Sequence, residues 1–350
     1  MEMRFLGKTG LKVSVLSFGT MTFGGKGRFS IVGSTQGVNA REQLARCLDA
    51  GINLVDTADI YSFGASEEVL GLAMNGRRDE LILATKCNAR MSEGVNAIGS
   101  SRHHIHRSCE ESLRRLRTDY IDLYQVHSID EFTAIEETLE ALDDLVRSGK
   151  VRYIGCSNYA SWQLMRALAV SDKNHFSRFV SLQAYYSLVA RDLEWELLPL
   201  CEQENLGVLV WSPLAGGFLS GKYGLKEENS EETRRESIPT PGLHDEAHGF
   251  GIVDVLREIA AERQVSVAQV ALNYIVHRKG VTSVIIGARN ATQLDENLDS
   301  VGWQLDPQQV QRLNEVSARP LPYPHWHQHL YNTERVLPRS YGAPWPTTEE

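Results

Sequence analysis

The sequence is poor in cysteine, which limits both disulfide and zinc interpretations. Its 350 residues include five cysteines, which are scattered and never form a CxxC pair. An odd and scattered set of thiols is typical of a protein in a reducing compartment rather than of a disulfide framework. The histidines at 103–106 and 325–329 lack a cysteine or a further ligand, so we interpret them as surface residues. We therefore expect free thiols and no metal site.

Long apolar runs and a basic surplus are also lacking. No stretch approaches the ~18 consecutive apolar residues of a membrane helix, and the first ten residues, MEMRFLGKTG, lack the apolar core of a signal peptide. Acidic residues outnumber basic ones by 45 to 36, giving a net charge of −9. Nucleic-acid binding needs a clustered basic face, so that partner is not expected. The pattern predicts a cytoplasmic protein that acts on small molecules, and it leaves homo-oligomers open.

What the sequence does contain is a regular alternation of strand-like and helix-like segments. Hydrophobic residues make up 42% and charged residues 23%, as in ordinary globular proteins. The segments between the strands carry apolar residues three and four apart, as in Leu139, Leu142 and Val146, which indicates amphipathic helices. Alternating strands and helices predict a parallel sheet. The strand-like runs cover residues 15–18, 53–55, 81–85, 121–126, 153–156, 181–184, 208–210 and 283–286.

The spacing of these runs favours a closed barrel over an open nucleotide-binding sheet. Six of the seven intervals between strand ends are short, and a long one precedes the last strand. An open dinucleotide-binding domain would show GxGxxG after its first strand, whereas GTMTFGG at 19–25 has other spacing. We predict an α/β fold, a (β/α)8 TIM barrel over about 14–301 within a single domain of 1–350. An N-terminal hairpin at 3–13, a long polar loop at 222–251 and an irregular C-terminal extension at 302–350 complete it.

Chemically reactive side chains follow three successive predicted strands. Asp56, Lys86 and His127 stand where strands two, three and four end, and Tyr61 lies five residues beyond Asp56 in DTADIY. In a β/α barrel the reactive groups stand at the carboxyl ends of strands, so we expect these four in one cleft. An internal salt bridge with a core histidine is the alternative for any of them taken singly.

Together, the four side chains suit proton donation to a carbonyl oxygen. A phenol has a pKa near ~10 and is a weak acid at neutral pH. A nearby ammonium favours the phenolate, so we expect Lys86 to lower the pKa of Tyr61, while Asp56 keeps Lys86 charged and oriented. His127 can donate a hydrogen bond to the same oxygen. The set indicates general acid catalysis.

At this point the sequence resembles the aldo-keto reductase superfamily over about residues 3–318. DTADIY, ATK ending at Lys86 and YQVH ending at His127 are similar to its catalytic segments, and GCSNY, LQAYYS, WSPLAGGFLSGKY and IIGARNATQLDEN to its cofactor segments. The resemblance implies catalytic residues Asp56, Tyr61, Lys86 and His127, the cofactor NADP(H) and reduction of an aldehyde or ketone.

The resemblance also implies a cofactor site. Ser157, Asn158 and Gln183 offer the polar groups that grip a carboxamide, Trp211 a flat face for the nicotinamide ring, and Arg289 a fork suited to a 2′-phosphate. Some members carry Lys where this sequence has Gly287. The implied residues are Gly19, Thr20, Met21, Asp56, Ser157, Asn158, Gln183, Trp211, Ser212, Pro213, Leu214, Gly217, Ser220, Lys222, Arg234, Gly287, Arg289, Gln293, Glu296 and Asn297.

The substrate pocket and the function class stay more open. We predict a partly aromatic pocket that contains Phe23, Asn88, Tyr323 and Trp326, and that takes a bulky carbonyl. Two other classes compete with the reductase: a cofactor-binding regulatory subunit of the channel β-subunit type, and a barrel hydrolase or isomerase without cofactor. An intact set of four catalytic residues disfavours the former, and the Trp211 and Arg289 segments disfavour the latter.

Overall fold

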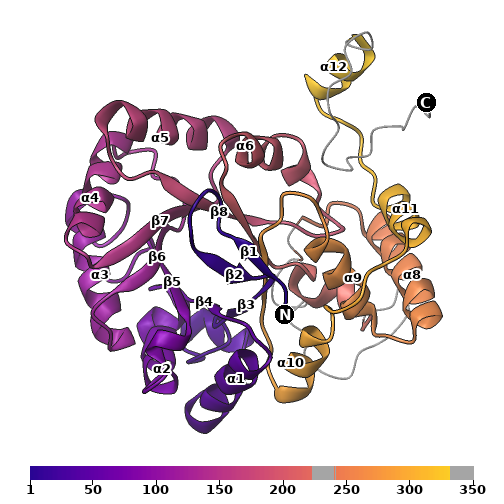
Figure 1. The fold of residues 1–350 in the computed structure, drawn as a ribbon, viewed down its shortest axis with the longest axis horizontal. Coiled ribbons are helices and arrows are strands. Elements are labelled where there is room, and N and C mark those ends of the chain that lie inside the picture. Colours follow the sequence, from indigo (N-terminus) through magenta and orange to yellow (C-terminus); the bar gives the residue numbers. More distant parts are fainter. Residues whose placement is uncertain (223–239, 241, 332–350) are drawn as a thin grey trace.

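Eight parallel strands close into a barrel, as predicted (Figure 1). The computed structural model describes residues 1–222, 240 and 242–331. Strand β10 pairs with both β9 and β3, and this completes the ring. The strands are β3 (Leu16–Gly19), β4 (Leu54–Asp56), β5 (Ile82–Cys87), β6 (Ile121–Val126), β7 (Val151–Ser157), β8 (Phe179–Tyr185), β9 (Gly207–Trp211) and β10 (Ser283–Ile286).

A two-stranded hairpin closes the end of the barrel where the strands begin. Strands β1 (Met3–Phe5) and β2 (Lys12–Ser14) pair antiparallel. Leu6 and Val13 of this hairpin are fully buried in one cluster with Leu54, Leu123 and other residues that fill the barrel. A Cβ on Gly207, the first residue of β9, would lie 2.5 Å from Cδ1 of Leu6. The hairpin therefore plugs this end, and the opposite end, where the strands finish, is left for a site.

Helices surround the barrel and bury their apolar stripes against the strands (Figure 1). In α4, for example, Leu139, Leu142 and Leu145 face the core while most of the charged residues face outward. The surrounding helices are α1 (Gly37–Asp49), α2 (Ala65–Ala73), α3 (Arg102–Leu116), α4 (Ile135–Arg147), α5 (Ser161–Asn174), α6 (Leu197–Gln203), α8 (Glu246–Arg263), α9 (Val267–Val276) and α10 (Ala291–Leu298). Short 3-10 segments are η1 (Gly27–Ile31), η2 (Tyr61–Gly64), η3 (Arg78–Glu80), η4 (Asp192–Glu194) and η5 (Ala215–Ser220). Among the described residues, none of the helices combines the length and apolarity that a membrane crossing requires.

The predicted long loop is shorter than expected, because α8 already begins at Glu246. Asp245 caps that helix, and its Oδ1 accepts hydrogen bonds from the backbone N–H groups of Ala247 (2.9 Å) and His248 (3.3 Å). The loop prediction is therefore wrong for 246–251, where this capping signal was missed. The rest of the predicted loop falls largely on residues 223–239 and 241, which lie outside the described part.

The C-terminal extension contains two helices that the sequence analysis did not predict. Helix α11 (Pro307–Val316) starts with a capping box between Asp306 and Gln309. Arg312 of this helix pairs with Glu258 and Glu262 of α8, both at 2.6 Å. Helix α12 (His325–Tyr331) lies outside the ring of helices, beyond α6 and α11 (Figure 1).

Candidate active site

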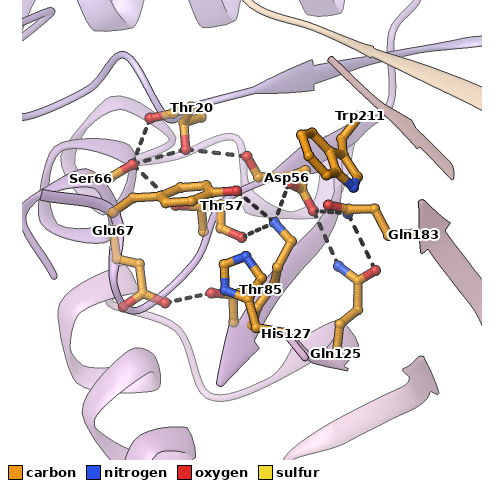
Figure 2. Close-up of polar contacts among 12 residues, drawn as sticks. Thr20, Asp56, Thr57, Ser66, Glu67, Thr85, Gln125, His127, Gln183 and Trp211 are labelled. Carbon is orange, nitrogen blue, oxygen red and sulfur yellow. Dashed lines mark hydrogen bonds and ion pairs between the residues drawn. The ribbon is translucent and has the colours of Figure 1, made fainter. Parts of the chain in front are cut away.

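Four side chains from three neighbouring strand ends meet where the strands finish, and Figure 2 labels Asp56 and His127 among them. Asp56 is the last residue of β4, Lys86 lies in β5, and His127 follows β6. The Nζ atom of Lys86 lies 2.5 Å from Oδ1 of Asp56, and it donates to the carbonyl oxygen of Thr57 (2.9 Å) and to the Tyr61 hydroxyl (3.2 Å). These four residues were predicted to share one cleft, and the structure brings them together. Their catalytic roles stay predictions.

Burial and ion pairing have opposite effects on the pKa of Lys86. Its side chain is fully buried, and that of Asp56 is 3% exposed. Burial by itself lowers the pKa of Lys86, but the neighbouring Asp56 carboxylate and the Tyr61 hydroxyl together more than compensate, so the net pKa is raised. Lys86 therefore keeps its charge in a place where an unpaired ammonium would lose it.

A strained turn positions Tyr61. The two residues after it, Ser62 and Phe63, have φ angles of 50° and 53°, which side-chain-bearing residues seldom adopt. Ser62 holds the turn, since its hydroxyl donates to the carbonyl oxygen of Phe23 (3.0 Å) and accepts from the N–H of Lys26 (3.3 Å). Such strain persists only where the surroundings fix it. Here they fix the residue whose hydroxyl meets Lys86.

The pKa of Tyr61 differs from expectation. Lys86 does lower it, but burial raises it by more, so the pKa of Tyr61 lies above its ordinary value of 10.0. The expected net lowering is wrong, because the desolvation of a buried phenolate outweighs the ammonium contact. The Lys86 charge therefore limits the cost of forming the phenolate rather than producing a phenolate at neutral pH.

His127 stands across from Tyr61 as a neutral imidazole. The two rings are perpendicular, with centroids 5.8 Å apart. Burial and the Lys86 ammonium lower the pKa of His127 to about 3. The backbone fixes its position, because its N–H donates to the carbonyl oxygen of Cys87 (2.9 Å) and its carbonyl oxygen accepts from Asn158 (3.0 Å). At neutral pH this side chain can donate a hydrogen bond without carrying a charge.

Next to the four residues lies a group of polar side chains whose chemistry fits a carboxamide. The Oγ atom of Ser157 is buried and has no hydrogen-bond partner among the described residues. Gln183 donates to Oδ2 of Asp56 (2.8 Å), and Nε1 of Trp211 donates to Oδ1 of Asn158 (3.1 Å). An orphaned hydroxyl beside two amides is the donor and acceptor set that a nicotinamide amide needs. The face of Trp211 lies alongside (Figure 2).

The small-residue segment after β9 has an open backbone. Ser212 adopts a φ of 53°, and its Oγ accepts from the N–H of Gly216 (3.1 Å). Gly217 has a φ of 101°, and a Cβ added there would meet nothing within 4 Å. Backbone groups in such a segment are accessible to a pyrophosphate. The predicted cofactor residues in this segment differ in their exposure to solvent. Pro213 is buried, Leu214 and Ser220 are half-buried, and Lys222 is exposed.

At the end of β10, the predicted phosphate ligand is already engaged. Arg289 donates from Nε to the carbonyl oxygen of Val32 (3.1 Å) and from Nη2 to that of Ile31 (2.9 Å), and its N–H donates to Gln293 (3.1 Å). It thereby joins the start of α10 to the C-terminal end of η1. Two other predicted residues lie nearby: Asn297 is buried and donates to the carbonyl oxygen of Gly287 (3.2 Å). Glu296 is exposed, and Arg234 lies outside the described residues.

Two of the predicted cofactor residues at 19–21 have structural roles in the barrel. A Cβ on Gly19 would lie 2.7 Å from Cγ2 of Ile285, so the barrel wall requires glycine. The Thr20 hydroxyl is fully buried and contacts Ser66 (3.0 Å), and it donates to the carbonyl oxygen of Asp56 (3.2 Å). The Thr20 side chain is therefore not available to a ligand. Met21 packs with the small cluster around Tyr61.

The predicted substrate pocket needs correction. Phe23 is fully buried and packs edge-on against Phe18 at 5.8 Å, so it belongs to the core and does not line the cleft. Trp326 lies in α12, outside the helix ring (Figure 1), and Tyr323 packs against it at 6.2 Å. Neither lines the opening. Asn88 stays near it, half-buried, and its amide donates to Ser100 (2.9 Å).

Sequence reasoning missed two buried polar residues beside the site. Gln125 of β6 is fully buried and donates to Oδ2 of Asp56 (3.2 Å). Asp59, within DTADIY, is also fully buried, and neither of its carboxylate oxygens has a hydrogen-bond partner in the described part of the chain. Burial raises the pKa of Asp59 well above its ordinary value. A polar residue inside an apolar strand was the available signal for Gln125.

The histidines and cysteines do not assemble into a metal centre. In the described ranges, no three His, Cys, Asp or Glu side chains gather as a metal site requires. All five cysteines are buried and unpaired. His104 was expected on a solvated surface, but it is 2% exposed, with Ser108 at 3.3 Å from its Nε2.

Comparison with known proteins adds to this geometry. A model of the Aldo/keto reductase family matches residues 15–318. An uncharacterized oxidoreductase of Bacillus subtilis is 38% identical, over 91% of this chain and 97% of its own. The versiconal hemiacetal acetate reductase of Aspergillus parasiticus is 33% identical, over 90% and 96%. A probable voltage-gated potassium channel subunit beta of Arabidopsis thaliana is 34% identical, over 86% and 91%.

Proposed function

Because this chain belongs to the aldo/keto reductase family, we propose that it is an NADPH-dependent oxidoreductase that reversibly reduces an aldehyde or ketone to the alcohol. Tyr61 acts as the general acid. The observation that carries this proposal is the continuous contact from Asp56 through Lys86 to the Tyr61 hydroxyl, with a neutral His127 beside it. A salt bridge that served stability alone would not require a phenol at its open end.

The chain's own residues perform the proton half of this reaction. The bound cofactor would supply the hydride to the carbonyl carbon. The substrate oxygen lies between the Tyr61 hydroxyl and the His127 imidazole, which both donate hydrogen bonds to it. As negative charge develops on that oxygen, Tyr61 transfers its proton, and the Lys86 ammonium stabilises the phenolate that remains. Asp56 keeps Lys86 charged and aimed at Tyr61.

Three groups of residues would hold the cofactor. Ser157, Asn158 and Gln183 would receive the carboxamide, and Trp211 would stack on the nicotinamide ring. The open backbone around Gly217 would receive the pyrophosphate. Arg289 would bind the 2′-phosphate, which favours NADPH over NADH. For this it must exchange its contacts with the carbonyl oxygens of Ile31 and Val32 for the more strongly accepting phosphate.

The walls around Tyr61 favour an apolar, bulky carbonyl substrate. Tyr61 packs in a cluster with Met21, Phe29 and Met91, and the Phe29 and Tyr61 ring centroids lie 5.9 Å apart. Two polar residues in the loop after β5 are occupied internally: Asn88 donates to Ser100, and Arg90 donates to the carbonyl oxygens of Ser92 and Gly94. A polyhydroxylated substrate would find few free partners on these walls. We therefore propose aromatic aldehydes and ketones as the substrate class.

A regulatory subunit of the channel β-subunit type is the second candidate, favoured by the similarity to the Arabidopsis protein. A single experiment separates the two. Purified protein is first titrated with NADPH to measure binding, and absorbance at the NADPH band is then followed over many turnovers with a panel of aromatic and sugar carbonyls. Sustained oxidation with aromatic carbonyls supports the reductase. Tight NADPH binding without turnover would favour the regulatory role, and no binding would refute both.

A further inference from the structure

The contact chain of the proposed active site continues beyond Asp56 into two buried amides. While Oδ1 of Asp56 faces Lys86, Oδ2 accepts from Nε2 of Gln183 (2.8 Å) and from Nε2 of Gln125 (3.2 Å). Nε2 of Gln183 also lies 3.4 Å from Oε1 of Gln125. Figure 2 shows the carboxylate and the two amides forming a closed triangle of polar contacts.

Gln125 is built into the barrel wall. It is fully buried, and its register partners are Lys86 on β5 and Gly155 on β7. A Cβ on Gly155 would lie 3.3 Å from Cγ of Gln125 and 2.6 Å from Oγ of Ser181. A side chain at 155 would therefore clash with Ser181 and press on Gln125. A buried amide is costly unless its polar atoms are paired, and those of Gln125 pair with Asp56 and Gln183.

These contacts decide which way the Gln183 amide faces. Both the Asp56 carboxylate and Oε1 of Gln125 are acceptors, so both require the N–H end of Gln183. The side-chain oxygen of Gln183 then remains outside this triangle. This oxygen is a hydrogen-bond acceptor, and it can accept from the N–H group of a nicotinamide carboxamide. Without Gln125, Gln183 would lose one of the two acceptors that fix its orientation, and Asp56 would lose one donor.

We propose that Gln125 is a positioning residue that fixes Gln183 in the orientation that accepts an N–H of the nicotinamide carboxamide, and so couples the seating of the cofactor to the Asp56–Lys86–Tyr61 contacts. This inference rests on the proposed function, because it requires Gln183 to contact a nicotinamide. Gln125 itself would not contact the cofactor, and its replacement would weaken binding of the nicotinamide end only.

The test compares the binding of three ligands that share the adenosine 2′-phosphate end and differ at the nicotinamide end. Gln125→Met keeps the length of the side chain and removes both hydrogen-bonding atoms. Ser181→Ala is the matched control, because Ser181 neighbours Gly155 in the same layer while its buried Oγ has no hydrogen-bond partner in the described part of the chain. Dissociation constants are measured by titration for NADPH, for adenosine 2′,5′-bisphosphate, which has no nicotinamide, and for the acetylpyridine analogue of NADPH, in which methyl replaces the carboxamide NH2.

We expect Gln125→Met to weaken NADPH binding roughly three- to tenfold, the worth of a hydrogen bond. Binding of the bisphosphate should stay within about twofold of wild type in the same assay, because the adenosine end is untouched. The preference for NADPH over the acetylpyridine analogue should shrink in Gln125→Met and persist in Ser181→Ala.

Equal weakening of NADPH and the bisphosphate would overturn the inference, because it would mark Gln125 as a general packing residue. Unchanged NADPH binding would overturn it as well. If Gln125→Met fails to fold, Gln125→Glu, which keeps the shape but changes the donor end, is judged by the same ratios. A wild-type protein that binds the bisphosphate but shows no further gain from the nicotinamide half would refute the proposed function itself.

Discussion

The state of His127 determines how the reaction responds to pH. With a pKa lowered to about 3, roughly one molecule in 10⁴ would carry a charged His127 at pH 7, against about one in four for an ordinary histidine. The pKa values of Tyr61 and Lys86 are both raised, so neither group loses its proton below about pH 9. We therefore expect kcat for carbonyl reduction to be level from about pH 5 to pH 9 and to fall only in strong alkali.

The assay is steady-state NADPH oxidation with one aromatic aldehyde at constant ionic strength. NADPH must be saturating, so that titration of its 2′-phosphate does not enter kcat. His127→Gln is the matched variant, because it keeps an N–H donor but cannot titrate. Its profile should be equally level at a lower kcat. The opposite outcome would be a wild-type kcat that increases about tenfold for each pH unit as the pH falls below 7, with no such increase in His127→Gln. It would show that a charged His127 is the acid, and the expectation of a level profile would be refuted.

Three further predictions concern single side chains. Tyr61→Phe should lower kcat by ~10²–10⁴-fold with little change in the dissociation constant for NADPH, and loss of less than tenfold would exclude Tyr61 as the acid. Arg289→Ala should weaken NADPH binding by ~1.5–3 kcal/mol and leave NADH binding nearly unchanged in parallel titrations; equal losses would show that Arg289 only anchors Ile31 and Val32. The raised pKa of Asp59 means that the native state keeps a proton that the unfolded chain releases above about pH 4. Stability should therefore fall as pH rises from that value towards the native pKa, by up to ~1.4 kcal/mol per pH unit. Asp59→Asn should remove this contribution to the slope in thermal melts above pH 4, and an unchanged slope would contradict the assignment.

The barrel and the convergence of the four polar residues were predictable because both follow from local patterns. Strand ends in a parallel barrel share one face, so Asp56, Lys86 and His127 had to meet once their strands were recognised. The direction of the net pKa shift of Tyr61 was not predictable in the same way. It depends on a balance between burial and one ammonium contact, and a sequence shows the neighbouring charge but not the degree of burial.

The residues that were misplaced share a different physical cause. Phe23 and Trp326 lie in segments without strand or heptad periodicity in the sequence, where nothing local decides whether an aromatic ring turns inward or outward. Phe23 packs on Phe18 because the turn after β3 folds back onto the core, and Trp326 leaves the opening because α12 extends beyond α6.

Gln125 is the opposite case, since strand alternation alone places it in the barrel interior beside Lys86. Its register neighbour Gly155 has no side chain, and a Cβ there would crowd the Ser181 hydroxyl first and the Gln125 side chain second. A polar residue on the inward face of a barrel strand, opposite a glycine on the next strand, therefore predicts a buried polar contact beside the site, and this is the contact through which we propose that Gln125 acts.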